Sequence, residues 1–457
     1  MQKLLGTTAE YAIRYLEGLN ARKVAPTEEA IANLIHFDQP LPNQPIAPEI
    51  VLQLLDKIGS PASMAMAGSR FFGMVTGGSL PVALAANWLA AAWDQNSVLY
   101  RITPGTAFLE QVALRWLLDV LHLPSDCAGA FVTGATAANF TALAAARHAV
   151  LKREGWNVEA DGLFGATPIA VAVSEEAHPT LLKALGLLGL GRNRVVKVPV
   201  DNQGRMRPNA IPTLTHPAII CTQVGNVNTG ACDPVREICD RAKEIGAWVH
   251  VDGAFGLWAA AAPSLAHLTA GVEEADSWAT DAHKWLNVPH DCGLAFVRDA
   301  KALQAAMAIT ADYLPTVSDR RNPSDYTLEL SRRARGVEVW AALRSLGRSG
   351  LADLIERTCS HAQHFAQELK AAGYKILNDV QLNQVLVSFG DAETTQRIIA
   401  DIQAEGTCWC GGTIWQGQTA MRICVSSWAT TDADVEKSLA VMLRIAGKYC
   451  SRELASV

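Results

Sequence analysis

The sequence is poor in charged residues and contains no run of like charge. Only 18% of its 457 residues are charged, and 39 Lys and Arg against 45 Asp and Glu leave a formal net charge of −6. Nucleic acids and anionic lipids are bound by clusters of Lys and Arg, and the sequence has no such cluster. The composition therefore argues against a nucleic-acid partner and favours small molecules or further copies of the chain.

Signals for secretion and membrane insertion are also lacking. Residues 1–24 carry charges every few positions instead of the apolar core of a signal peptide, which is typical of an amphipathic helix. The longest apolar stretch, residues 80–93, contains Asn87 and falls short of the ~20 residues that a spanning helix needs. We interpret this stretch as a buried helix and expect a cytoplasmic protein without membrane contact.

Cysteine pairs of the kind that bind metals are absent. None of the ten Cys forms a C-x-x-C pair, and Cys408 and Cys410 are closer together than the ligands of a usual zinc site. The pattern favours reduced, buried thiols over disulfides. No metal site is predicted.

Three segments with different patterns are present. Residues 1–65 are predicted to form helices joined by a Pro-rich extended connector (37–49), an arm that cannot bury itself. In residues 66–335, short apolar runs alternate with helical patterns, which is typical of a mainly parallel sheet covered on both faces. Residues 336–457 indicate a smaller α+β unit. We therefore predict an α/β fold with a helical dimerisation arm (1–65), a large domain (66–335) and a small C-terminal domain (336–457).

Ligands of open α/β sheets gather outside the carboxyl ends of the strands, so the residues at those ends are candidates for a site. One predicted strand enters a helix through Thr133, Gly134, Ala135 and Thr136. Helix N-terminal N–H groups and a Thr side chain suit a phosphate, although neither a P-loop nor a G-x-G-x-x-G motif is present. An ordinary capped helix is the alternative. His178 follows a second strand, where a structural hydrogen-bonding role competes with a catalytic one.

Two further strand ends carry charged residues. Asp252 ends an apolar strand, and a buried carboxylate there requires a cation or hydrogen-bond donors. Lys284 lies in a low-charge stretch, where a desolvated amine suits a Schiff-base nucleophile; a surface lysine with a packed stem is the alternative. A phosphate cradle, a carboxylate for a protonated pyridine nitrogen, a His to lie on a ring and a Lys for an aldehyde are together the parts that hold pyridoxal 5′-phosphate.

The same motifs resemble those of the group II pyridoxal-phosphate decarboxylases, which include aromatic-L-amino-acid, glutamate and tyrosine decarboxylases. The resemblance covers nearly the whole chain and is specific at residues 71–78 (FFGMVTGG), 228–234 (NTGACDP), 250–256 (HVDGAFG) and 275–285 (ADSWATDAHKW). It implies the type I fold of pyridoxal-phosphate enzymes. It also implies a homodimer whose arm wraps the second subunit and whose active sites are shared.

The resemblance implies a role for each matching residue. Lys284 is implied to be the Schiff-base lysine, Asp252 the partner of the pyridinium nitrogen, and His178 the residue stacked on the ring. The other implied cofactor-binding residues are Ala135, Thr136, Ala254, Asp281 and His283.

Three residues bear on the reaction and the substrate. Tyr313 falls where decarboxylases of this family carry a loop tyrosine that protonates the carbon after CO2 leaves, whereas Phe there is associated with aldehyde-forming members; a Tyr that anchors an exposed loop is the alternative. Arg422 resembles an Arg that pairs with a substrate carboxylate in glutamate decarboxylases, but a salt bridge between domains is equally compatible. Phe72 is expected in an apolar wall of the substrate pocket. His290 stands where the resemblance leads us to expect an aromatic or another large residue.

We therefore predict a pyridoxal-phosphate-dependent decarboxylase that converts an L-amino acid with an aromatic or large apolar side chain to the amine and CO2. An aldehyde-forming decarboxylase, a carbon–carbon lyase and an aminotransferase remain as alternatives that use the same cofactor. An inactive cofactor-binding protein that acts by interaction is the alternative from another class.

Overall fold

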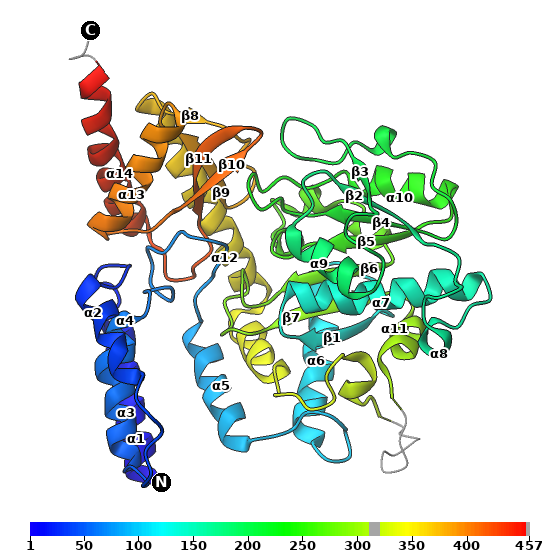
Figure 1. Cartoon of the computed structure of the whole chain (residues 1–457), viewed down its shortest axis with the longest axis horizontal. Helices are drawn as coiled ribbons and strands as arrows, with labels where there is room; N and C mark the ends of the chain where they lie inside the picture. The colour runs from blue at the N-terminus through cyan, green and yellow to red at the C-terminus, as the bar shows by residue number, and fades with distance from the viewer. Residues whose placement is uncertain (310–319, 454–457) are drawn as a thin grey trace. The chain divides into compact units, whose positions relative to one another are not determined.

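A computed structural model of the chain describes residues 1–309 and 320–453 (Figure 1). The chain divides into two compact units. Unit 1 comprises Met1–Gly78, His361–Leu377 and Val385–Val457, and unit 2 comprises Ser79–Ser360 and Asn378–Gln384. The domain limits predicted after residues 65 and 335 stay a prediction.

Unit 2 is built on a seven-stranded sheet in the order β1-β7-β6-β5-β4-β2-β3. Strands β2 to β6 pair in parallel, whereas β7 lies antiparallel between β1 and β6. This mainly parallel sheet confirms the predicted α/β fold class. The strands are β1 (Ala128–Val132), β2 (Ala170–Ser174), β3 (Val196–Val198), β4 (Ala218–Gln223), β5 (Trp248–Asp252), β6 (Ser277–Asp281) and β7 (Gly293–Val297).

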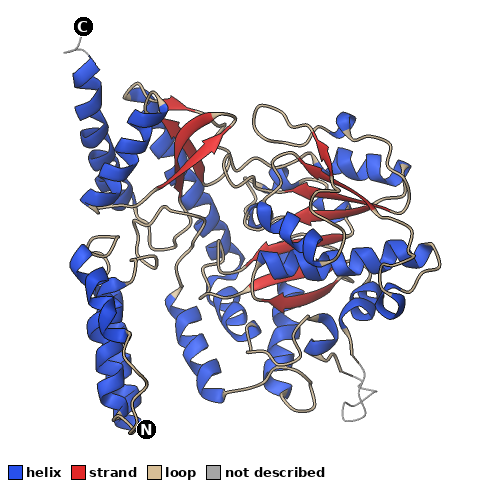
Figure 2. Cartoon of the chain, viewed as in Figure 1, coloured by secondary structure: helices blue, strands red, loops and turns tan. Residues whose placement is uncertain are grey.

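Helices flank this sheet, as Figure 2 shows. All strands of this sheet except β3 are almost continuously buried, which is why their sequences are apolar runs rather than alternating patterns. The helices of unit 2 are α5 (Pro81–Trp93), α6 (Pro104–Val120), α7 (Ala135–Arg153), α8 (Val158–Asp161), α9 (Pro179–Leu187), α10 (Val235–Glu244), α11 (Ala300–Met307) and the first part of α12 (Gly336–Ala371), with 3-10 turns η3 (Pro208–Ala210), η4 (Gly256–Ala261), η5 (Ala266–Thr269), η6 (Val272–Glu274) and η7 (Pro323–Tyr326).

The predicted burial of the apolar stretch at residues 80–93 is wrong. The stretch does form a helix, α5, but only Ala83 and Ala86 are buried in it. Trp88 and Leu89 are 42% and 56% exposed, because the helix packs against the rest of unit 2 through its alanine face and Asn87, which donates to Glu338. None of the helices in residues 1–309 and 320–453 is long and apolar enough to cross a membrane.

Unit 1 contains the N-terminal helices and a four-stranded sheet in the order β10-β11-β9-β8. The predicted amphipathic helix and the extended connector are both present, since η1 ends at Phe37 and α3 begins at Pro48. The elements are α1 (Gln2–Gly18), α2 (Glu28–Ala32), η1 (Asn33–Phe37), α3 (Pro48–Leu54), η2 (Leu55–Gly59), α4 (Ser60–Ala62), the end of α12, β8 (Lys375–Ile376), β9 (Gln384–Ser388), α13 (Ala392–Glu405), β10 (Gly411–Trp415), β11 (Gln418–Cys424) and α14 (Asp432–Glu453).

A close backbone contact fixes the turn between β1 and α7. Gly293 opens β7 and pairs in register with Val132 on one side and Asp281 on the other. A Cβ atom on Gly293 would lie 2.5 Å from the Cα atom of Gly134, closer than any real contact. The absence of a side chain at residue 293 therefore allows the β1–α7 turn to lie directly on the edge of β7.

We expect the Gly293→Ala variant to lose about 1–3 kcal/mol of unfolding free energy, because the added methyl group meets backbone that cannot move aside. Gly105→Ala is the matched control, since a Cβ atom there meets nothing within 4 Å. Urea unfolding of both variants beside the parent protein measures the difference. Equal stability of the two variants would contradict the contact.

Candidate active site

The candidate residues at the strand ends lie at the edge of the unit 2 sheet that is formed by the carboxyl ends of its parallel strands. Asp252 and Asp281 are the last residues of the neighbouring parallel strands β5 and β6, and His178 follows β2. The β1–α7 turn reaches the same edge, since Gly134 lies beside Asp281 and His283. The structure therefore brings together the four strand ends that the sequence singled out.

Asp252 is a buried carboxylate that hydrogen-bond donors meet directly. It is 4% exposed, accepts a hydrogen bond from Asn139 Nδ2 at 3.1 Å on Oδ2, and accepts one from the Ala254 backbone N–H at 3.3 Å on Oδ1. Burial raises the pKa of Asp252, while the charges of His178 and Lys284 and the Asn139 hydrogen bond oppose that rise. The Asp252 carboxylate can thus bind a cationic group at the carboxyl end of β5.

Lys284 forms an ion pair with Asp281, which lies three residues earlier in the chain. Its Nζ atom lies 3.0 Å from Asp281 Oδ2, and its side chain is 22% exposed. The other oxygen, Asp281 Oδ1, is buried without a hydrogen-bond partner among the described residues. His283 Nε2, at 3.8 Å, is too far from this oxygen for a hydrogen bond. A buried acceptor of this kind indicates a place for a further donor group.

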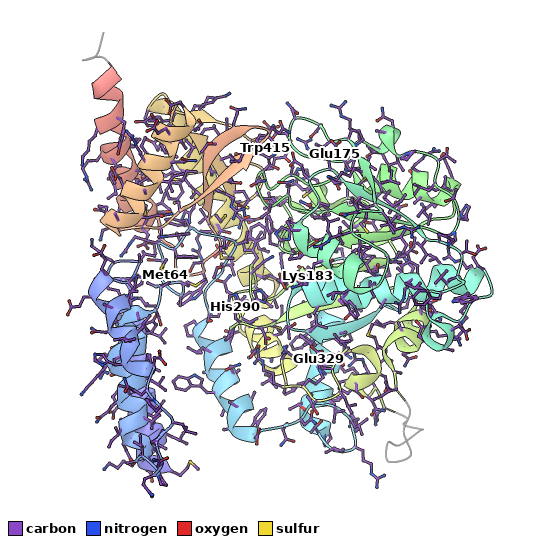
Figure 3. The ribbon with its side chains drawn as sticks, viewed as in Figure 1. Met64, Glu175, Lys183, His290, Glu329 and Trp415 are labelled. Carbon is purple, nitrogen blue, oxygen red and sulfur yellow. The ribbon has the colours of Figure 1, made fainter. Side chains whose placement is uncertain are left out.

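His283 is held in one orientation by the backbone. The Cys292 N–H donates to its Nδ1 atom at 3.1 Å, so the ring proton of the neutral imidazole lies on Nε2, which faces Asp281. Its ring lies 4.3 Å from that of His290, at an interplanar angle of 33°. Burial lowers the pKa of both imidazoles. His290, labelled in Figure 3, thus supports the ring of His283.

His178 has a structural role in addition to its place in the site. It is the N-cap residue of α9, and its Nδ1 atom accepts the Thr180 N–H at 3.3 Å and lies 2.7 Å from Thr180 Oγ1. The structural hydrogen-bonding role is therefore present, and the ring also acts electrostatically on Asp252. The catalytic role of His178 stays a prediction.

The turn before α7 lacks a side-chain cap. Gly134 occupies the N-cap position in an extended conformation, and no side chain among the described residues caps the helix there. The first N–H groups of a helix without such a cap attract an anion. Ala135 is buried and Thr136 half-buried at this end of α7. The alternative of an ordinary capped helix is therefore not what the structure shows.

Three further residues are predicted to act on the substrate. Phe72 and Arg422 belong to unit 1. Phe72 is buried there, with its ring 5.2 Å from that of Phe365, and Arg422 is half-buried on β11 opposite Gly411. Tyr313 lies outside the described residues. Their proposed roles stay predictions.

The sequence reasoning missed Asn139, His250 and Ser277, although His250 and Ser277 lie in motifs that it quoted. Asn139 is held by His250, and His250 by Ser277, and all three are fully buried. One signal was available in the strand, since the period of two in Trp248-Val-His250-Val-Asp252 places its polar side chains on the same face. The partners of these side chains lie in other elements and could not be read from the strand.

Comparison with known proteins identifies a matching family and several relatives. The profile of the family described as "Pyridoxal-dependent decarboxylase conserved domain" matches residues 38–390. The L-tyrosine/L-DOPA decarboxylase 2 of Lophophora williamsii is 31% identical over 305 residues, which are 62% of this chain and 57% of that protein. The aromatic-L-amino-acid decarboxylase of Bacillus atrophaeus is 23% identical and covers 97% of this chain and 94% of its own.

A solved structure shares the fold over almost the full length. The structure of Oryza sativa TDC with PLP and tryptamine superimposes with a TM-score of 0.91 and 21% identity, over 98% of each chain. This likeness establishes the fold of the chain.

The buried His250 makes stability depend on pH. Burial lowers the pKa of His250 from 6.5 to about 3, so between these values the unfolded chain binds a proton that the folded chain does not. The unfolding free energy should therefore fall as the pH decreases below about 6.5, with His250 contributing about 1.4 kcal/mol per pH unit. Urea unfolding at pH 7, 6 and 5 measures this slope. The His250→Gln variant should show a pH dependence of the unfolding free energy that is weaker by about 1.4 kcal/mol per pH unit, because it lacks this proton. Equal slopes for the variant and the parent protein would refute the role of His250 in the pH dependence.

Proposed function

Because the chain belongs to the pyridoxal-dependent decarboxylase family, we propose that it removes the α-carboxylate of an L-amino acid with an aromatic or large apolar side chain, giving the amine and CO2. The observation that carries this proposal is the grouping of Asp252, Lys284 and His178 at one sheet edge, beside the uncapped N-terminus of α7. This cofactor-dependent chemistry is that of the family, whereas the substrate and the product are the proposal.

The residues at this edge fit pyridoxal 5′-phosphate. The α7 N-terminus with Ala135 and Thr136 would hold the phosphate, since its N–H groups have no side-chain cap among the described residues. Asp252 would pair with the pyridine nitrogen, His178 and Ala254 would lie on opposite ring faces, and Lys284 would bind the aldehyde carbon. The orphan Asp281 Oδ1 offers an acceptor beside Lys284 and His283. When bound, the cofactor supplies an electron sink for the pair released as CO2 leaves.

The chain's own residues prepare this chemistry through hydrogen bonds and charge. Asn139 and the Ala254 N–H stabilise the anionic form of Asp252, which is the form that pairs with a protonated nitrogen. Asp281 holds the Lys284 ammonium in place at 3.0 Å and can share its proton. We assign the protonation of the substrate carbon to Tyr313, by the family resemblance stated above.

The substrate preference rests on named relatives and on two residues of unit 1. Two relatives are named for tyrosine, DOPA or aromatic amino acids, and the Oryza sativa structure contains tryptamine. Phe72 is proposed to face the substrate side chain, and Arg422 to bind a substrate carboxylate. An apolar neighbour such as Phe72 favours an aromatic or aliphatic side chain over an acidic one.

We further propose a homodimer with shared active sites, in line with the family resemblance. Apolar side chains are exposed along the arm of unit 1, including Ile13 and Leu16 on α1 and Ile50 and Leu54 on α3. Neither helix has a buried residue. Trp88 and Leu89 of α5 in unit 2 are exposed in the same way. Large apolar side chains exposed in this way are typical of subunit interfaces.

The assignment of Lys284 can be tested by trapping. Borohydride should fix the bound cofactor covalently to the protein, and peptide mapping should locate the label on Lys284, because its Nζ atom is the amine beside Asp281. Lys183→Ala, an alteration of another lysine in unit 2, is the control and should label normally. A label that persists in Lys284→Ala would rule out the assignment.

The substrate and product can be tested with a pool of L-amino acids. We expect CO2 and the corresponding amine from an aromatic amino acid, and a fall of at least about tenfold in amine formation for Tyr313→Phe if the tyrosine delivers the proton. Aldehyde with ammonia and peroxide would instead indicate an aldehyde-forming decarboxylase. A keto acid without CO2 would indicate an aminotransferase, and cleavage of a side-chain bond a carbon–carbon lyase. Cofactor binding with no product from any amino acid would favour the inactive binding protein.

A further inference from the structure

A continuous chain of hydrogen bonds runs through the core of unit 2 to Asp252. Trp248 Nε1 lies 2.9 Å from Ser277 Oγ, Ser277 Oγ lies 2.9 Å from His250 Nδ1, and His250 Nε2 lies 2.8 Å from Asn139 Oδ1. Asn139 Nδ2 completes the chain, at 3.1 Å from Asp252 Oδ2. Trp248, Ser277, His250 and Asn139 are all 0–2% exposed.

The arrangement follows from the strand geometry. Trp248, His250 and Asp252 alternate along β5 and so share one face of the sheet. Ser277 on β6 pairs in register with His250, which brings its hydroxyl to the imidazole. Helix α7 packs against β5 and β6, and Asn139 lies in its first turns. Two strands and one helix therefore each supply members of the chain.

The Asp252 carboxylate and a neutral His250 ring fix the direction of every hydrogen bond. The carboxylate can only accept, so the Asn139 amide N–H donates to Asp252 and Asn139 Oδ1 faces His250. His250 Nε2 therefore donates to Asn139 Oδ1, and in a neutral ring Nδ1 is then an acceptor. Ser277 donates its single proton to this Nδ1 atom, while its oxygen accepts from the Trp248 indole, which can only donate.

We propose that Ser277, His250 and Asn139 are positioning residues that act as a one-way hydrogen-bond relay, holding Asp252 anionic and aimed at the pyridine nitrogen of the cofactor. This inference rests on the proposed function in one respect only, the identity of the group that Asp252 receives. Each donor in the relay polarises the next, so the carboxylate receives a stronger hydrogen bond than an isolated amide would give it. The His250 ring must be neutral in this arrangement. A doubly protonated ring would donate from Nδ1, and the Ser277 hydroxyl could then no longer donate to it.

The direction of the hydrogen bonds in the relay can be measured in the protein with all relay residues intact. In full-length protein labelled with 15N at histidine, the His250 resonances should show a protonated Nε2 and an unprotonated Nδ1 that accepts a hydrogen bond. His250→Gln assigns the signals among the 11 His of the chain. A proton on Nδ1, or on both nitrogens at pH 7, would overturn the relay.

Its effect on the cofactor can be measured with three variants. Ser277→Ala removes the donor to His250 and should weaken pyridoxal 5′-phosphate binding about tenfold, the order expected when a buried hydrogen bond in a network is lost. Its 15N spectrum should also show His250 Nδ1 shifted towards the value of a ring nitrogen without a hydrogen bond. Ser277→Thr keeps the hydroxyl and should restore both readouts. Ser97→Ala is the matched control, because Ser97 is also fully buried and bonded to a hydroxyl, that of Thr106, outside the relay.

These outcomes separate the relay from the proposed function. If the cofactor binds and is trapped on Lys284 but Ser277→Ala retains the parent affinity, the relay is refuted and the proposed function stands. If Ser97→Ala weakens cofactor binding as much as Ser277→Ala does, the loss of affinity reflects a general loss of stability, and the relay is also refuted. If the parent protein binds no cofactor, the proposed function fails, and the His250 spectrum alone decides the direction of the hydrogen bonds.

Discussion

The need to keep a carboxylate charged inside the protein governs the organisation of unit 2. An unpaired buried carboxylate would take up a proton or destabilise the fold, so Asp252 requires donors that cannot turn away. The Ala254 N–H comes from the chain segment that follows β5, whereas the Asn139 amide comes from α7. The position of the Asp252 carboxylate therefore depends on how α7 lies on the sheet. The position of α7 depends in turn on the conformation of the turn at Gly134.

Helix α7 links the two ends of the candidate cofactor site. Its uncapped N-terminus, at Ala135 and Thr136, faces the place proposed for a phosphate, and Asn139 follows about one turn later with its amide on Asp252. Gly293 allows the preceding turn to lie on β7. A displacement of this helix would change both ends of the site together. The geometry of the site is thus set by backbone packing as much as by the residues that would touch the cofactor.

Much of this could be predicted from the sequence, because apolar runs and the residues that end them are local signals. The strands that lead to Gly134, His178, Asp252 and Asp281 were predicted in this way and are present. The antiparallel direction of β7 was not, since its residues are as apolar as those of the parallel strands. The burial of α5 was predicted wrongly, because composition does not say whether the same chain covers an apolar face. The pairing of Lys284 with Asp281 and of His250 with Ser277 depends on register, which no local pattern encodes.

The alignment of β5 with β6 has a consequence for folding. Because successive side chains of a strand point to opposite faces, a slip of one residue would turn Trp248, His250 and Asp252 to the other face, and would separate His250 from Ser277. Such a misaligned sheet would bury an indole N–H, an imidazole and a carboxylate without partners. Apolar strands alone would discriminate weakly between neighbouring registers, since Val and Ala pack on either face. The polar side chains of β5 therefore favour the native strand register. A sheet in the wrong register is less stable because it buries these side chains without partners, even before the native contacts of the site have formed.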